Sequence, residues 1–186
     1  MNKTFTSEKS TCEKYTLRWN HSGWWAIFFV DSERGALSVQ SGYGDYSYMW
    51  GNHGRESFKH FILELDKDHQ YIMGKFSMGN KNGDWFDYPA SVKRLKEQIT
   101  EARREKYVTP NVARRAWNSI GSLDDFGGNS ADLFAMGIYE NPDLMACVGE
   151  EMECMPVVKD YNPDLKNFMK NIFPAFVGAI REEISS

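Results

Sequence analysis

Apolar and polar residues alternate along the first third of the chain, and this period of two constrains the fold more than any other feature. Residues 14–19, 36–41 and 46–50 each alternate in this way, which places their apolar side chains on one face of a strand. Residues 24–30 are continuously apolar, as in the central strand of a sheet. Turn sequences with glycine separate the four segments and favour hairpin connections. The pattern predicts an antiparallel meander of about four strands.

The spacing of apolar residues then changes to that of a helix. Ser57 is followed by apolar residues at intervals of three and four, namely Phe58, Phe61, Ile62 and Leu65. This spacing predicts a helix with Ser57 as its N-cap. Because an uncovered meander is only marginally stable, we expect the helix to cover the apolar face of the sheet. We expect a short helical segment and then a surface loop to follow, over 71–76 and 77–84.

A pair of helices begins the second half of the chain. Apolar residues line one face over 90–106, and Thr109-Pro110 is typical of a helix start, here of a helix that ends near Ile120. Residues 89–120 hold eight basic and three acidic side chains, a net charge of +5. The sequence therefore predicts a basic helical hairpin.

The rest of the second half is acidic. Residues 121–186 hold four basic and twelve acidic side chains, a net charge of −8. Ser130 begins a short helix, residues 139–161 are expected to be irregular, and Asn162-Pro163 begins a last helix with an expected kink at Pro174. Such separation of charge indicates either pairing between the two segments or faces of opposite sign for a partner.

The expected fold class is α+β. An N-terminal antiparallel β-meander covered by helices is followed by a helical C-terminal half. We expect residues 1–88 to form the sheet with its covering helix and residues 89–186 to pack on it as the helical half. At 186 residues, the chain is long enough for one good core, so one compact domain is expected.

The sequence contains no recognisable catalytic or metal-binding constellation. Three histidines and two aspartates fall within seventeen residues, but without a zinc signature (His53, His60, Asp66, Asp68 and His69). Asp66 and Asp68 with Lys75 resemble a nuclease site only loosely. The three cysteines, Cys12, Cys147 and Cys154, have no activating partner and match no common zinc pair. We expect no enzymatic activity, no cofactor and no metal.

The location expected from the sequence is the cytoplasm. The N-terminus has no apolar segment typical of a secretory signal, and no run approaches the roughly 18 apolar residues of a membrane span. An odd number of widely spaced cysteines fits a reduced compartment. We therefore expect no membrane partner.

Candidate binding residues fall into three groups. Tyr43 and Tyr46 are aromatic residues in and beside a hairpin turn and are expected to contact a partner. The basic group is expected to steer association (Arg103, Arg104, Arg114 and Arg115), and so is an acidic stretch (Glu150, Glu151 and Glu153). Direct binding of nucleic acid is not expected, because the chain is acidic overall with a pI of about 5.6.

Several aromatic segments resemble a family of small proteins carried by phages and prophages of Gram-negative bacteria. The most specific part runs from Trp25 through Gly35 to Trp50, and the resemblance extends from about residue 15 to 183. Further matching segments are 58–62, 71–76, 95–99, Ala116-Trp117 and 173–177. The resemblance brings no catalytic residue. It implies a phage context, in which small proteins without catalytic motifs are often inhibitors of host machinery, including anti-CRISPR and other anti-defence proteins.

The resulting expectation is a phage- or prophage-encoded protein that inhibits a host defence complex by protein–protein contact, most specifically an anti-CRISPR protein. The partner would be a host protein complex such as a CRISPR effector. One alternative is a nucleic-acid-binding accessory protein of phage replication or regulation. Another is a metal-dependent hydrolase built from His60, Asp66 and His69. The sequence leaves the target, the binding face and the oligomeric state open.

Overall fold

The computed structural model describes residues 6–19, 23–78, 85–123, 130–149 and 152–186. The chain forms two compact units, which we call the sheet unit (residues 1–83 and 161–186) and the helical unit (residues 84–160). Each unit has its own apolar core. The sequence predicts one compact domain with parts 1–88 and 89–186, whereas the structure groups the last helical segment with the sheet. The reason is that Leu165, Phe168 and Phe176 are fully buried in the core of the sheet unit.

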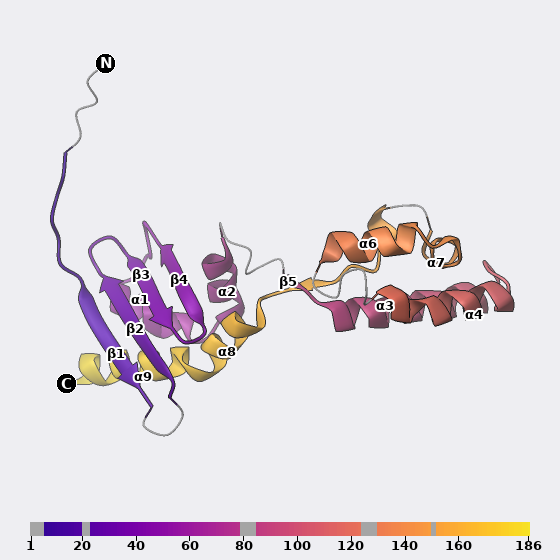
Figure 1. Ribbon diagram of the computed structural model, residues 1–186. Coiled ribbons are helices and arrows are strands. Elements are labelled where there is room, and N and C mark those ends of the chain that lie inside the picture. Colours follow the sequence, from indigo (N-terminus) through magenta and orange to yellow (C-terminus); the bar gives the residue numbers. More distant parts are fainter. Residues whose placement is uncertain (1–5, 20–22, 79–84, 124–129, 150–151) are drawn as a thin grey trace, which may run out of the picture. The chain divides into compact units, whose positions relative to one another are not determined.

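Four strands form the antiparallel meander that the alternation predicts. They are β1 (Glu13–Arg18), β2 (Trp25–Asp31), β3 (Ala36–Ser41) and β4 (Gly44–Met49), paired in chain order (Figure 1). The turn between β2 and β3 requires Gly35, whose φ is +64° and where a Cβ atom would lie 2.4 Å from the carbonyl oxygen of Trp50. This conformation favours glycine. The α+β fold class is confirmed.

One face of the sheet carries the core. The register aligns Tyr15, Phe28, Val39 and Tyr46 across the four strands on this face. Phe28 is fully buried, and its ring stacks on that of Phe176 with centroids 3.8 Å apart and planes 5° apart. Burial of such aromatic area is a dominant contribution to a core.

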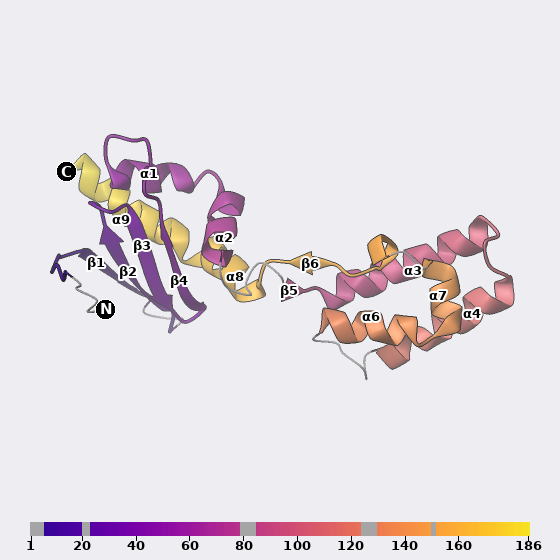
Figure 2. The same ribbon diagram turned by 90° about the horizontal axis from the view of Figure 1, so that it is seen from above.

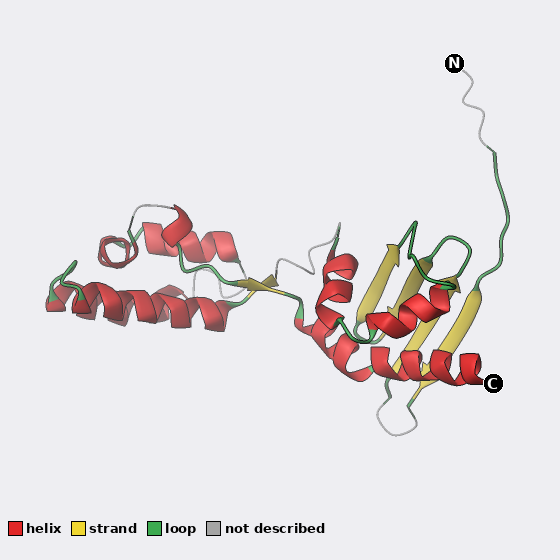
Figure 3. Cartoon of the chain, turned by 180° about the vertical axis from the view of Figure 1, so that it is seen from behind, coloured by secondary structure: helices red, strands yellow, loops and turns green. Residues whose placement is uncertain are grey.

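Four helices cover this face, namely α1 (Phe58–Leu65), α2 (His69–Ser77), α8 (Pro163–Asn171) and α9 (Phe173–Ser185). Figures 1 and 3 show them from opposite sides, and in Figure 2 the sheet and its helices form two layers. The predicted N-cap is confirmed, because the hydroxyl of Ser57 accepts a hydrogen bond from the backbone N–H of His60. The break between α8 and α9 lies at Ile172, two residues before Pro174, close to the predicted kink.

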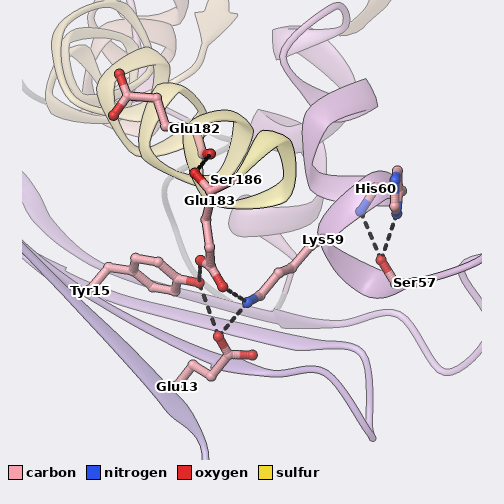
Figure 4. A network of polar contacts seen from close by, with 8 residues as sticks. All are labelled: Glu13, Tyr15, Ser57, Lys59, His60, Glu182, Glu183 and Ser186. Atoms are coloured by element: carbon pink, nitrogen blue, oxygen red, sulfur yellow. Dashed lines mark hydrogen bonds and ion pairs between the residues drawn. The ribbon is translucent and has the colours of Figure 1, made fainter.

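A polar network joins β1, α1 and α9 at the edge of this core (Figure 4). The ammonium of Lys59 lies 2.5 Å from Glu13 Oε2 and 2.6 Å from Glu183 Oε1, and the hydroxyl of Tyr15 donates to Glu183 Oε2 at 2.6 Å. Desolvation, followed by the hydrogen bond to Glu183, raises the pKa of Tyr15 to about 12. Desolvation alone would lower the pKa of Lys59, but its hydrogen bonds to Glu13 and Glu183 outweigh that effect and raise it.

The helical unit begins and ends at a short two-stranded ribbon. Its strands are β5 (Trp85–Phe86) and β6 (Lys159–Asp160), which pair antiparallel. Next to it, the buried hydroxyl of Ser91 accepts from the backbone N–H of Val158 at 2.8 Å and donates to the carbonyl of Asp87 at 2.7 Å. These bonds tie the incoming and outgoing segments together.

The helices of this unit are α3 (Tyr88–Arg104), α4 (Pro110–Ser119), α6 (Ala131–Tyr139) and α7 (Pro142–Val148). The described part of this unit also contains the short 3₁₀ turns η2 (Ile120–Ser122) and η3 (Met152–Cys154). The predicted hairpin is confirmed as α3 and α4, with Thr109 as the N-cap of α4. Their apolar faces meet through Leu95, Ile99 and Ala116, all buried.

The prediction that residues 139–161 are irregular is wrong in part, because α7 lies there. The side chain of Asn141 caps this helix by accepting from the backbone N–H groups of Asp143 and Leu144, both at 3.1 Å. Pro142 occupies the first turn, where its missing N–H costs nothing.

Among the described residues, no helix is both long and apolar enough to cross a membrane.

Candidate binding surfaces

Tyr46 is a core residue rather than the predicted contact for a partner. Its exposed fraction is 4%, and its ring packs against Phe168 and Phe76 at centroid distances of 5.0 and 5.7 Å. Its hydroxyl donates to the carbonyl of Tyr43 at 2.5 Å. Desolvation raises its pKa to about 12, with nearby Asp164 and Asp45 adding to the effect. Tyr46 therefore holds the β3–β4 turn against the core.

Tyr43 lies in that turn and belongs to an aromatic cluster at one end of the sheet. Its ring meets the ring of Trp24 at 5.9 Å, and Trp24 meets Trp19 at 6.4 Å, both edge to face. Trp24 and Trp25 are 38% and 42% exposed. We call Trp19, Trp24, Trp25 and Tyr43 the aromatic end.

The two exposed tryptophans border two hollows in the sheet unit. One, of about 430 Å³, is lined by Thr16, Arg18, Trp19, Gly23, Trp24, Trp25 and Ile27. The other, of about 150 Å³, is lined by Gly23, Trp24, Trp25, Gly42, Tyr43 and Ile172. Trp, Tyr and Arg are the residues that most often carry the binding energy of protein interfaces. The aromatic end thus has the composition of an interface hot spot.

Sequence reasoning places Trp24 and Trp25 inside a buried central strand. The structure differs because β2 starts at Trp25, so Trp24 lies outside the ladder. Trp25 pairs with Arg18, and both are exposed on the face of the sheet opposite the core. The sequence contains a signal for this position, since the turn-forming sequence 20–23 directly precedes the two tryptophans.

A second surface lies between α3 and α4. We call it the hairpin groove: a hollow of about 350 Å³ lined by Ile99, Thr100, Arg103, Pro110, Ala113, Arg114 and Trp117. Ile99 and Ala113 are buried and form an apolar floor, whereas Arg103 and Arg114 are exposed. Two of the four predicted arginines therefore converge on one hollow.

The other two predicted arginines are paired within the helical unit. Arg115 binds Asp143 of α7 through two parallel contacts of 2.8 and 2.7 Å, and Arg104 lies 3.4 Å from Glu101 and 3.0 Å from Glu105. The hydrogen bond to Arg115 lowers the pKa of Asp143. Internal pairing of the basic hairpin with the acidic segment thus occurs at Arg115.

Trp117 is a groove residue that sequence reasoning missed. It is 45% exposed, and the ammonium of Lys96 lies 5.6 Å from the centroid of its ring. It also borders a neighbouring hollow of about 470 Å³, lined by Lys93, Lys96, Glu97, Thr100, Glu101, Arg104 and Trp117. The available signal was its position one residue after Ala116, outside the buried stripe of α4.

The predicted acidic group is described only in part. Glu150 and Glu151 lie outside the described residues, and Glu153 is exposed in η3. Its place in the proposed steering surface stays a prediction.

Two of the three histidines considered for a metal site have other contacts. His60 Nδ1 lies 2.8 Å from the hydroxyl of Ser57, and the ring of His53 packs near Phe58 and Phe61. His69 Nε2 lies 3.6 Å from Asp66. Within the part of the chain that the structure describes, no three His, Cys, Asp or Glu side chains gather as they would around a metal ion.

Comparison with known proteins identifies the family. A family model described as "Phage family" (Phage_phiTE_072) matches residues 5–182. No curated protein and no solved structure matches the chain. Because the match spans both units, the chain belongs to this family of phage proteins.

Proposed function

We propose that this phage protein inhibits a host defence complex by protein–protein contact, and that in its most specific form it is an anti-CRISPR protein. It acts by occupying its target rather than by catalysis, and it does so in the cytoplasm of the bacterial host. The target is a host protein complex such as a CRISPR effector. Membership of a phage family supports the part of this proposal that makes the chain a phage protein.

The observation that carries the proposal is the aromatic end. Trp24 and Trp25 expose large rings at the end of a four-stranded sheet, and Tyr43 and Trp19 support Trp24 edge to face. Rings fixed in this way contribute contact area on binding at little cost in conformational entropy. The exposed rings can enter pockets of a partner, and the hollows beside them can accept side chains of that partner.

The charges of the helical unit support a role in steering. Arg103 and Arg114 are exposed and have no ion pair among the described residues. Exposed cations of this kind raise the association rate with an acidic partner and make that rate sensitive to salt. We therefore expect the target to present an acidic surface.

The test is phage plating on bacteria with an active CRISPR or other defence system, with and without this protein. Expression is expected to restore plating on one system and to leave plating on the defence-free strain unchanged. The double variant Trp24→Ala/Trp25→Ala is expected to lose the effect.

Met49→Ala is the matched control, because Met49 is 60% exposed on the same sheet and borders neither hollow. It should restore plating as well as the wild type. Restored plating by the double tryptophan variant, or no restoration on any defence system, would contradict the proposal.

A further inference from the structure

The hairpin groove combines three chemical features, of which the proposed function uses only the positive charge of the arginines. Its rim carries two guanidinium groups, Arg103 and Arg114, with no carboxylate partner among the described residues. Its wall is the half-exposed indole of Trp117, and its floor is the apolar surface of Ile99 and Ala113. At about 350 Å³, it lies within the usual size range of small-ligand pockets.

Each feature matches one part of a nucleotide. Guanidinium groups bind phosphate through planar, paired hydrogen bonds. An indole offers a face on which any base can stack. The hydroxyl of Thr100 donates to the carbonyl of Lys96 at 2.8 Å, which leaves its oxygen free to accept from a sugar hydroxyl or a base amino group.

We propose that the hairpin groove binds a nucleotide, either free or as a unit of a single strand, with phosphate at Arg103 and Arg114 and the base against Trp117. An acidic peptide would satisfy the arginines but would not require a flat face on which to stack, whereas a base does. This site lies in the helical unit, so it goes beyond the protein contact proposed for the aromatic end.

The acidic charge of the whole chain does not oppose this assignment. The chain carries −4, but residues 89–120 carry +5, and charges beyond about 8–10 Å are screened at physiological salt. The neighbouring hollow is lined by three basic side chains (Lys93, Lys96 and Arg104) and two acidic ones (Glu97 and Glu101), of which Glu101 is paired with Arg104. The local field therefore favours an anion, contrary to the expectation from the overall pI.

The test uses the full chain and two probes at low salt. A fluorescein-labelled oligothymidine of ten nucleotides is titrated by fluorescence polarisation, and ADP is titrated by calorimetry. Arg103→Ala and Arg114→Ala should each weaken binding at least about tenfold. Trp117→Ala should weaken it at least about fivefold, and Trp117→Phe should keep most of the affinity.

Arg94→Ala is the matched control, because Arg94 is an exposed arginine of α3 that borders neither hollow. Its affinity should stay within about twofold of the wild type. Thermal melts should show all arginine variants folded, since Arg94, Arg103 and Arg114 are exposed on the helices.

The two probes distinguish the sources of the nucleotide. Binding of ADP alone identifies a free nucleotide, and tighter binding of the oligonucleotide identifies a strand; either result supports the proposal. No binding of either probe at low salt would overturn it. Equal losses in Arg94→Ala and Arg103→Ala, or displacement by hexaglutamate with no dependence on Trp117, would overturn it as well.

Discussion

At the scale of single residues, a stacked pair of aromatic rings joins the sheet to the C-terminal helix. Phe28 of β2 stacks on Phe176 of α9, and both are fully buried. Phe29, the next residue, lies on the opposite face of the sheet and is half-buried. Neighbours in sequence thus differ in burial because side chains alternate along a strand.

Phe28→Ala should lower the free energy of unfolding by about 3–5 kcal/mol, because it leaves a cavity against Phe176. Phe29→Ala is the matched control and should cost about 1 kcal/mol. Urea denaturation followed by circular dichroism measures both. Equal losses for the two variants would show that the assigned faces of the sheet are wrong.

The same alternation explains what the sequence predicts about single residues and what it does not. A period of two identifies Tyr46 and Val39 as strand residues, but the register that pairs them decides that both face the core. Trp117 lies outside the stripe of its helix, and its role depends on Arg103 of another helix. Convergence of residues from different elements is a long-range property, so the groove could not be predicted.

At the scale of elements, the network of Tyr15, Lys59, Glu13 and Glu183 fastens the first strand to the last helix. The pKa of Tyr15 rises from 10.0 to about 12, and that of Lys59 also rises. Groups whose pKa is raised by folding contribute stability below their unfolded pKa and lose it as pH rises through the folded value.

The free energy of unfolding should therefore fall as pH rises from about 10 to 12. Tyr15→Phe should flatten part of this dependence, because the hydroxyl that titrates is gone. Urea denaturation at several pH values between 9 and 12 measures it. An unchanged slope in Tyr15→Phe would contradict the assigned network.

In the acidic range the free energy of unfolding should change with pH in the opposite direction, falling as pH falls. The hydrogen bond to Lys59 and then that to Tyr15 lower the pKa of Glu183. Its contribution is present above its ordinary pKa and is lost as pH falls through the lowered value. Glu183→Gln should thus reduce the acid dependence of stability, measured between pH 2 and 6.

Local signals account for most elements, and long-range packing accounts for the rest. The caps Ser57 and Thr109 and the alternation of the strands act within a few residues, so these elements agree with the structure. The sequence Asn141-Pro142 caps helix α7, but this helix has only seven residues and its apolar stripe is too short to predict it within an acidic segment. The similar sequence Asn162-Pro163 precedes a longer apolar stripe, which does predict a helix.

At the scale of the whole molecule, the chain leaves the sheet unit after residue 83 and returns to it at residue 161. The sheet needs α8 and α9 to cover its apolar face. Packing between segments that are distant in the sequence decides which helices cover the sheet, so no local sequence pattern predicts it.

Phe168→Ala should therefore weaken the sheet unit and spare the helical unit. Phe168 is fully buried against Phe28 and Tyr46, so its loss removes support from β2 and β4. Hydrogen exchange should become faster at the amides of β2 and β4 and stay unchanged in α3. Equal acceleration in both units would mean that they unfold as one.

The most direct test of the proposed function is the affinity of the purified protein for the purified effector complex of the defence system that it inhibits in the plating test. The wild type should bind, and Trp24→Ala/Trp25→Ala should raise the dissociation constant by about 30-fold or more, as expected for hot-spot residues. Met49→Ala should bind like the wild type. Wild-type affinity in the double tryptophan variant would contradict a partner contact at the aromatic end.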